Sequence, residues 1–179
     1  MRKRCNRVCV VAKGDQRATK SDKAGVIWTF GLWIFLFFAA TTLIGNTYTV
    51  TNNNDTGPGS LRDAINQANG HYNARDTIQF NIPGVGPHTI RPLSQLPQLI
   101  DPAGVFIDGL SQAGATTGNN PPSTAVLMIE VNGANAGASH GFYILSPNNT
   151  IQGLVIDSFQ QDGIRIEGTE AGTHNNLIY

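Results

Sequence analysis

The highest density of residues able to do chemistry lies near the end of the 179-residue chain. One arginine and several carboxylates gather there, at Asp157, Asp162, Arg165, Glu167 and Glu170. Paired carboxylates supply the acid and the base of glycoside cleavage, and an arginine beside them can bind a uronate. Arg165 and Glu167 would share the outer face of one strand, because strand side chains alternate. We favour a solvated, ion-paired surface for this cluster, since such pairs contribute little energy; a polysaccharide-active site is the alternative.

The other residues with acid–base or metal-binding chemistry are dispersed. The histidines are His71, His88, His140 and His174, and the sequence has no HxH or HExxH pattern. Asp101 and Asp108 flank a predicted strand in turn-like contexts, so we assign them to turns. No nucleophile elbow, phosphate-binding loop or dinucleotide fingerprint occurs in the sequence. We therefore predict no catalytic residue, no cofactor and no metal ligand.

Charge is divided unevenly along the chain, although Lys+Arg 12 balance Asp+Glu 12. Residues 1–23 carry eight bases and two acids, and residues 24–179 carry the remaining four bases and ten acids. Phosphate binding needs clustered Lys and Arg, so we exclude nucleic acid as a partner of the larger part. Both cysteines, Cys5 and Cys9, lie in the basic segment. The larger part therefore has neither a disulfide framework nor a Cys-ligated zinc.

A basic leader followed by an apolar run predicts export. Residues 24–45 contain no charged residue and include both tryptophans. This order is typical of a secretory signal peptide, and small residues such as Ala39 and Ala40 favour cleavage. The run is also long enough to span a bilayer as an uncleaved signal-anchor, a transmembrane helix that would tether a display module. We assign residues 1–45 to this leader and predict a secreted or cell-surface protein of the bacterial envelope, with membrane contact only through residues 24–45.

Residues 46–82 are expected to form a strand, a helix and a second strand. Residues 47–51 and 77–82 alternate in polarity, as strands do. Ser60 can cap a helix with Asp63 in its first turn, and Asn69-Gly70 ends that helix. Asp55 and Asp63 lack the spacing of a calcium loop, so we give this segment a structural role and leave calcium binding as the lesser alternative.

Residues 83–179 read as short strands separated by Gly, Asn, Pro and Ser. The expected strands are 89–93, 104–108, 125–131, 141–145, 149–156, 163–167 and 176–179. Hairpin and crossover-helix signals are scarce, which favours a solenoid. An internal repeat of 22 residues supports this, because aligning Gly141 with Gly163 matches Phe142 to Ile164 and Ile144 to Ile166.

Two asparagine pairs extend the repeat. With one five-residue insertion, Asn148-Asn149 align with Asn175-Asn176 and Ile151 with Ile178. Stacked asparagines can hydrogen-bond from one turn of the chain to the next and satisfy buried polar groups. Ordinary turn chemistry at these positions is the alternative.

The segments 49–65 and 76–82 resemble the start of bacterial right-handed parallel β-helix surface proteins. These include the group named for a C-S-L-R-E-A motif, read here as Gly59-Ser60-Leu61-Arg62-Asp63-Ala64, and the polymorphic outer-membrane repeat proteins. The resemblance implies an all-β, pectate-lyase-like (pectin lyase-like) solenoid over 83–179. It also implies an N-terminal strand–helix cap over 46–82, with an apolar targeting helix before it. Family members are usually longer, which indicates a fragment truncated at the C-terminus.

The predicted function is a non-catalytic, exported module of a surface or adhesion protein. Its long faces would present Asn, Thr, Tyr and acidic groups to surface glycans or to protein partners. The alternative is the N-terminal part of a carbohydrate-active enzyme resembling the polysaccharide lyases and hydrolases.

Overall fold

The computed structural model of the protein describes residues 44–119, 124–168 and 173–179. It has one α-helix, α1 (Leu61–Asn69), and one 3-10 turn, η1 (Gly109–Ser111), within these ranges. The strands are β1 (Thr47–Val50), β2 (Asp76–Phe80), β3 (His88–Ile90), β4 (Val105–Asp108), β5 (Ile129–Asn132), β6 (Phe142–Ile144), β7 (Thr150–Gln152), β8 (Leu154–Asp157), β9 (Ile164–Ile166) and β10 (Leu177–Ile178).

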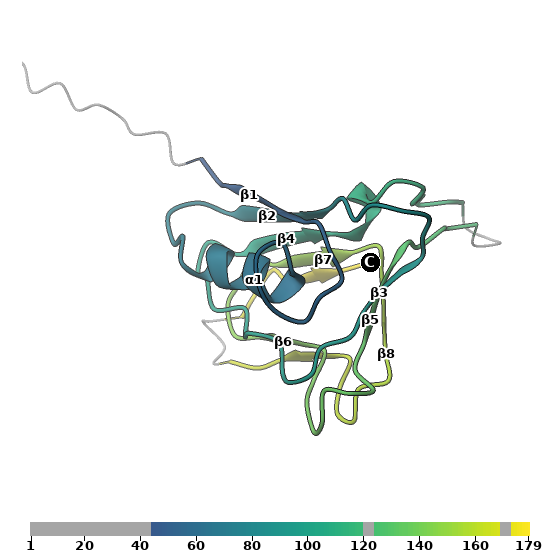
Figure 1. The fold of residues 1–179 in the computed structure, drawn as a ribbon. Coiled ribbons are helices and arrows are strands. Elements are labelled where there is room, and N and C mark those ends of the chain that lie inside the picture. Colours follow the sequence, from purple (N-terminus) through teal and green to yellow (C-terminus); the bar gives the residue numbers. More distant parts are fainter. Residues whose placement is uncertain (1–43, 120–123, 169–172) are drawn as a thin grey trace, which may run out of the picture. The chain divides into compact units, whose positions relative to one another are not determined.

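The strands form three parallel sheets (Figure 1). The first has the order β1-β2-β4-β7-β10, the second β3-β5-β8, and the third β6-β9. All pairings between these named strands are parallel. Sequence neighbours such as β4, β5 and β6 lie in different sheets, so each sheet is built from segments far apart in the chain.

Helix α1 forms where the sequence predicts it. The Ser60 hydroxyl accepts a hydrogen bond from the Asp63 N–H at 3.2 Å, and the Asp63 carboxylate accepts one from the Gly59 N–H at 3.3 Å. These bonds satisfy backbone donors that the first turn leaves free. The buried residues of α1 are Leu61, Ala64, Ile65 and Ala68, which share one face of the helix.

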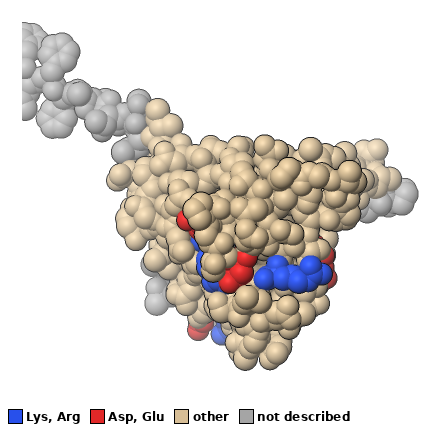
Figure 2. Space-filling view, viewed as in Figure 1, with Lys and Arg blue, Asp and Glu red and all other residues tan. Residues whose placement is uncertain are grey.

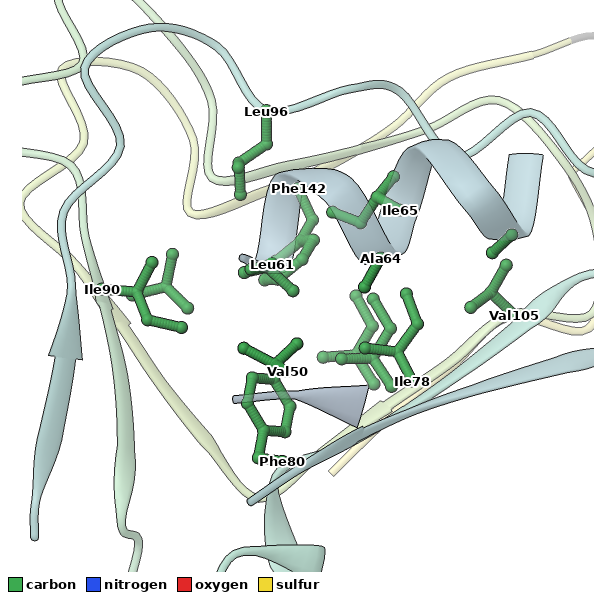
Figure 3. Packing of buried hydrophobic residues seen from close by; sticks show 14 of the residues in the cluster. Val50, Leu61, Ala64, Ile65, Ile78, Phe80, Ile90, Leu96, Val105 and Phe142 are labelled. Carbon is green, nitrogen blue, oxygen red and sulfur yellow. The ribbon is translucent and has the colours of Figure 1, made fainter. Parts of the chain in front are cut away.

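The core is continuous between α1 and the inner faces of the sheets. Figure 3 shows Leu61 and Ala64 of the helix packed close to Val50 and Ile78 of β1 and β2. In β2 and β4 the residues alternate between buried and partly exposed, as strands covered on one side do. Phe80, Ile107 and other apolar side chains of these strands are therefore removed from water, which drives their packing.

The register expected from the internal repeat is confirmed. Phe142 pairs with Ile164 and Ile144 with Ile166 across β6 and β9. Ile151 pairs with Ile178 across β7 and β10. The expected strand over 149–156 is instead two strands, because Gly153 turns the chain with φ +67. A Cβ there would lie 2.6 Å from Leu110 Cγ, so only glycine fits this corner.

Asn149 joins neighbouring strands through its fully buried side chain. Its Oδ1 accepts a hydrogen bond from the Val105 N–H at 2.9 Å, and its Nδ2 donates to Asn176 Oδ1 at 3.0 Å. Nδ2 also lies 2.9 Å from the Ser146 carbonyl oxygen. The interpretation of the asparagines as an internal ladder is confirmed, because the Asn149 side chain links Val105 of β4 to Asn176, the residue before β10.

The expected fold class is wrong. An all-β right-handed parallel β-helix, a pectin lyase-like solenoid, was expected, with the helix only as a cap. The described residues form a mixed α/β fold with parallel sheets of five, three and two strands and one helix. The reason is that α1 contributes buried side chains to the same core as the strands. The sheets are also unequal, because α1 alone lies between β1 and β2 in the chain, where a regular solenoid would place strands of the other sheets.

The structure does not cover the apolar targeting helix that is expected before the sheets. Apart from residues 44 and 45, the predicted leader lies outside the described residues. Over the ranges that the structure covers, no helix is long and apolar enough to cross a membrane.

We predict that Asn149→Ala destabilises the protein by about 2 kcal/mol, because it leaves the buried Val105 N–H without a partner. Chemical denaturation measures this change in the free energy of unfolding. Asn54→Ala is the matched control, since Asn54 is exposed, and it should change stability by less than about 0.5 kcal/mol. Equal stability of the two variants would refute the ladder's structural role.

Candidate functional site

The carboxylate cluster expected from the sequence is partly assembled beside β6 and β9. Asp162, Arg165 and Glu167 lie together, and His140 and Tyr143 join them from the neighbouring segment. Asp157 is not part of this group, because β8 places it in the three-stranded sheet, against Glu130. Glu170 lies outside the described residues. We call the five assembled residues the β6–β9 cluster.

Ion pairs and hydrogen bonds connect the members of the β6–β9 cluster. Arg165 Nη1 lies 3.4 Å from Asp162 Oδ2, and Arg165 Nε lies 3.5 Å from Glu167 Oε2. The Tyr143 hydroxyl donates a hydrogen bond to Glu167 across the two strands. His140 Nδ1 accepts a hydrogen bond from the Asp162 N–H at 3.2 Å, and its ring meets Tyr143 edge-on at 5.4 Å between centroids.

These contacts set the protonation of the cluster. The hydrogen bond from Tyr143, and then the charge of Arg165, lower the pKa of Glu167 below its usual value. The same bond raises the pKa of Tyr143, because Glu167 is best satisfied by a protonated phenol. Hydrogen bonding to Asp162 and the charge of Glu167 raise the pKa of Arg165. Glu167 is thus held ionised at neutral pH, where an ionised carboxylate cannot donate a proton.

The other carboxylates proposed from the sequence have structural partners. Asp108 accepts hydrogen bonds from the Leu110 N–H at 3.0 Å and from Gln152 Nε2 at 2.8 Å, so its role in a turn is confirmed. Asp55 pairs with Arg62 at 2.7 Å and accepts a bond from the Leu93 N–H. Burial acts to raise the pKa of Asp55, but the bonds to Arg62 and Leu93 leave it below its usual value. Asp63 caps α1.

A buried pair of aspartates was missed in the sequence. Asp76 and Asp101 are both 0 % exposed, and one oxygen of each, Oδ2, has no hydrogen-bond partner. His71 Nδ1 lies 2.8 Å from Asp76 Oδ1. Burial, together with the charge of Asp76, raises the pKa of Asp101. The only signal in the sequence was that each aspartate follows or precedes a turn, which is common for exposed residues as well.

The remaining histidines do not form a site with the β6–β9 cluster. His88 is buried in β3, and His174 lies in a short segment before β10. Within the described residues, no group of three or more His, Cys, Asp or Glu side chains is placed to hold a metal ion.

A pocket of about 400 Å³ was also missed in the sequence. Its lining includes Leu110 in η1, Leu127 before β5, Gln152 at the end of β7 and Tyr179 after β10. These residues come from four separate segments, and the pairing of β7 with β10 brings Gln152 and Tyr179 together. No local pattern in the sequence marks such a pocket.

Comparison with known proteins adds no relative. No protein-family model, no curated protein and no solved structure matches the chain. The interpretation of the site therefore depends on its own geometry.

We predict that Asp101→Asn stabilises the protein at neutral pH. A raised pKa means that the folded state binds the Asp101 proton more tightly than the unfolded state, so stability is lost as the pH rises through that pKa. The neutral amide keeps an acceptor for the Ala103 N–H and removes a charge that faces Asp76. Thermal unfolding at pH 7 should show a Tm higher by about 2–4 °C.

The control for this prediction is Asp157→Asn, which alters an exposed carboxylate and should leave Tm nearly constant. The advantage of Asp101→Asn should shrink toward pH 4. If Asp101→Asn raises Tm by the same amount at pH 4 and pH 7, or at neither pH, the assignment of a destabilising buried charge to Asp101 is wrong.

Proposed function

We propose that the chain is an exported, non-catalytic binding module of a bacterial surface or adhesion protein, and that the β6–β9 cluster binds glycans. The observation that carries this proposal is the Tyr143 ring, fixed between His140 and Glu167 on the outside of the two-stranded sheet. A fixed aromatic ring bordered by charged and hydrogen-bonding groups loses little conformational entropy on binding.

The protonation of the cluster favours recognition over catalysis. A polysaccharide hydrolase needs one carboxyl group with a raised pKa as its acid. Here Tyr143 and Arg165 lower the pKa of Glu167. The one carboxyl group with a raised pKa among the described residues, Asp101, is fully buried. The Glu167 carboxylate beside Arg165 is suited to accepting hydrogen bonds from sugar hydroxyls.

Export is supported by the leader and by the composition of the larger part. Residues 1–23 are basic and 24–45 are uncharged, the order of a secretory signal. The resemblance of residues 49–65 to exported bacterial surface proteins supports the same location.

In the face of the molecule shown in Figure 2, charged side chains are few, and positive and negative ones lie next to each other. Such a surface does not favour binding to nucleic acid.

Glycan binding is tested with the exported protein on an array of bacterial and host glycans, followed by titration calorimetry with the best ligand. We expect binding without release of reducing ends. Tyr143→Ala should weaken it at least tenfold, because it removes the ring and the donor to Glu167. Tyr72→Ala, at another tyrosine that is 54 % exposed, should bind like the original chain. Survival of all glycan binding in Tyr143→Ala, or sugar release, would contradict the proposal, and capture of a protein ligand alone would favour the protein-binding alternative.

Export is tested separately by mass spectrometry of the protein recovered from the culture medium and the cell envelope. We expect a mature chain that begins near residues 43–47, since small residues end the apolar run. Recovery of the intact leader in the cytoplasmic fraction alone would refute export. This test needs no variant, because its readout is the mass of the chain.

A further inference from the structure

The outer face of the five-stranded sheet carries a line of polar side chains that leads into the pocket. We propose that this line and the pocket bind a neutral oligosaccharide, with one sugar ring held against Tyr179. The inference shares the binding role of the proposed function but assigns a second site, on another sheet from the β6–β9 cluster.

Parallel pairing in register creates the line. Thr49 pairs with Gln79, Gln79 with Asp108, and Asp108 with Gln152. The Tyr179 N–H donates to the Ile151 carbonyl oxygen, which places Tyr179 next to Gln152 in the same direction. Each of these positions alternates with a buried residue such as Ile78 or Ile107, so the line faces outward. We call these side chains the outer polar line.

Hydrogen bonds hold the outer polar line in place before any ligand binds. Gln79 Nε2 donates to Thr49 Oγ1 at 2.9 Å, and Gln152 Nε2 donates to Asp108 Oδ1 at 2.8 Å. Both amide nitrogens are thus engaged, and the amide oxygens remain as acceptors for hydroxyl groups. Neighbouring strands lie about 4.8 Å apart, so the four strands from Gln79 to Tyr179 span about 14 Å. This length suits a short oligosaccharide better than a single ring.

The pocket closes one end of the line. Leu110 and Leu127 form apolar walls, Tyr179 adds an aromatic ring that is 74 % exposed, and Gln152 and Thr117 supply an amide and a hydroxyl. The Gly153 corner lets Leu110 approach the backbone, since a Cβ at that position would lie 2.6 Å from Leu110 Cγ. A volume of about 400 Å³ lies in the range of small-molecule sites.

The chemistry of these walls selects a neutral sugar. A pyranose ring has an apolar face of C–H groups, which packs on an aromatic ring, and a rim of hydroxyl groups, which need acceptors. Among the described residues that line the pocket there is no lysine, arginine, aspartate or glutamate, so they offer an anionic or cationic ligand no charge partner. Asp108, the nearest carboxylate in the line, already accepts from Gln152 and Leu110. A purely apolar ligand would leave the Gln152 and Thr117 groups unpaired, which costs free energy.

The test is calorimetric titration of the exported chain with neutral tetrasaccharides of glucose, galactose, mannose and N-acetylglucosamine. Matched oligogalacturonate and the apolar dye ANS are titrated beside them. We expect at least one neutral tetrasaccharide to bind, and Tyr179→Ala to weaken it at least tenfold. Tyr179→Phe, which keeps the ring, should bind within threefold of the original chain. Val85→Ala, at a residue that is 100 % exposed and outside the line, is the control for unspecific effects.

Competition between the two sites separates this inference from the proposed function. Tyr143→Ala should leave neutral tetrasaccharide binding unchanged. Loss of that binding in Tyr143→Ala but not in Tyr179→Ala would overturn the second site and leave the proposed function standing. Binding of ANS alone, binding of oligogalacturonate alone, or no binding at millimolar concentration would each overturn the inference. Equal thermal unfolding of the Tyr179 variants and the original chain confirms that the variants are folded.

Discussion

The side chain of Asn149 is the connection on which the arrangement of the sheets depends. It accepts a hydrogen bond from the backbone of Val105 and donates to Asn176, so it joins the start of β4 to the segment before β10. A buried amide has few ways to satisfy its donors and acceptors, and a shift of one residue in any of these segments would leave some of them unpaired. The apolar core tolerates small changes of packing, whereas this network allows one register only.

That register has consequences at the surface. With β4, β7 and β10 aligned, the side chains of Asp108, Gln152 and Tyr179 fall next to one another on the outside of the sheet. On the two-stranded sheet the same principle places Tyr143 beside Arg165. Polar groups that are many residues apart in the sequence therefore become neighbours in space, and they form hydrogen bonds and ion pairs with one another. Glu167, held in this way, is a fixed acceptor with a lowered pKa and is poorly suited to proton transfer.

Local structure was predicted well from the sequence because local rules determine it. Ser60 and Asp63 specify the start of α1 by capping chemistry, and the spacing of Leu61, Ile65 and Ala68 specifies its buried face. The repeat that aligned Phe142 with Ile164 predicted a real strand pair, because stacked strands need matching apolar residues. The fold class was not predicted, since nothing in residues 61–69 shows that the helix packs into the same core as the strands. Gly153, the buried pair Asp76 and Asp101, and the pocket likewise depend on contacts between distant segments.

The position of β1 has a mechanical meaning. It is the first strand of the chain that the structure describes and the edge strand of the five-stranded sheet, and it pairs with β2 in parallel over four residues. A pull on the chain before Thr47, directed along the strand, loads the bonds between β1 and β2 in shear, so that they share the force and do not open one after another. Leu61 and Ile65 of α1 lie in the same core as Val50 of β1 and Ile78 of β2, so sliding β1 out would also expose apolar surface to water. The start of this fold therefore resists tension that is applied along the chain before Thr47.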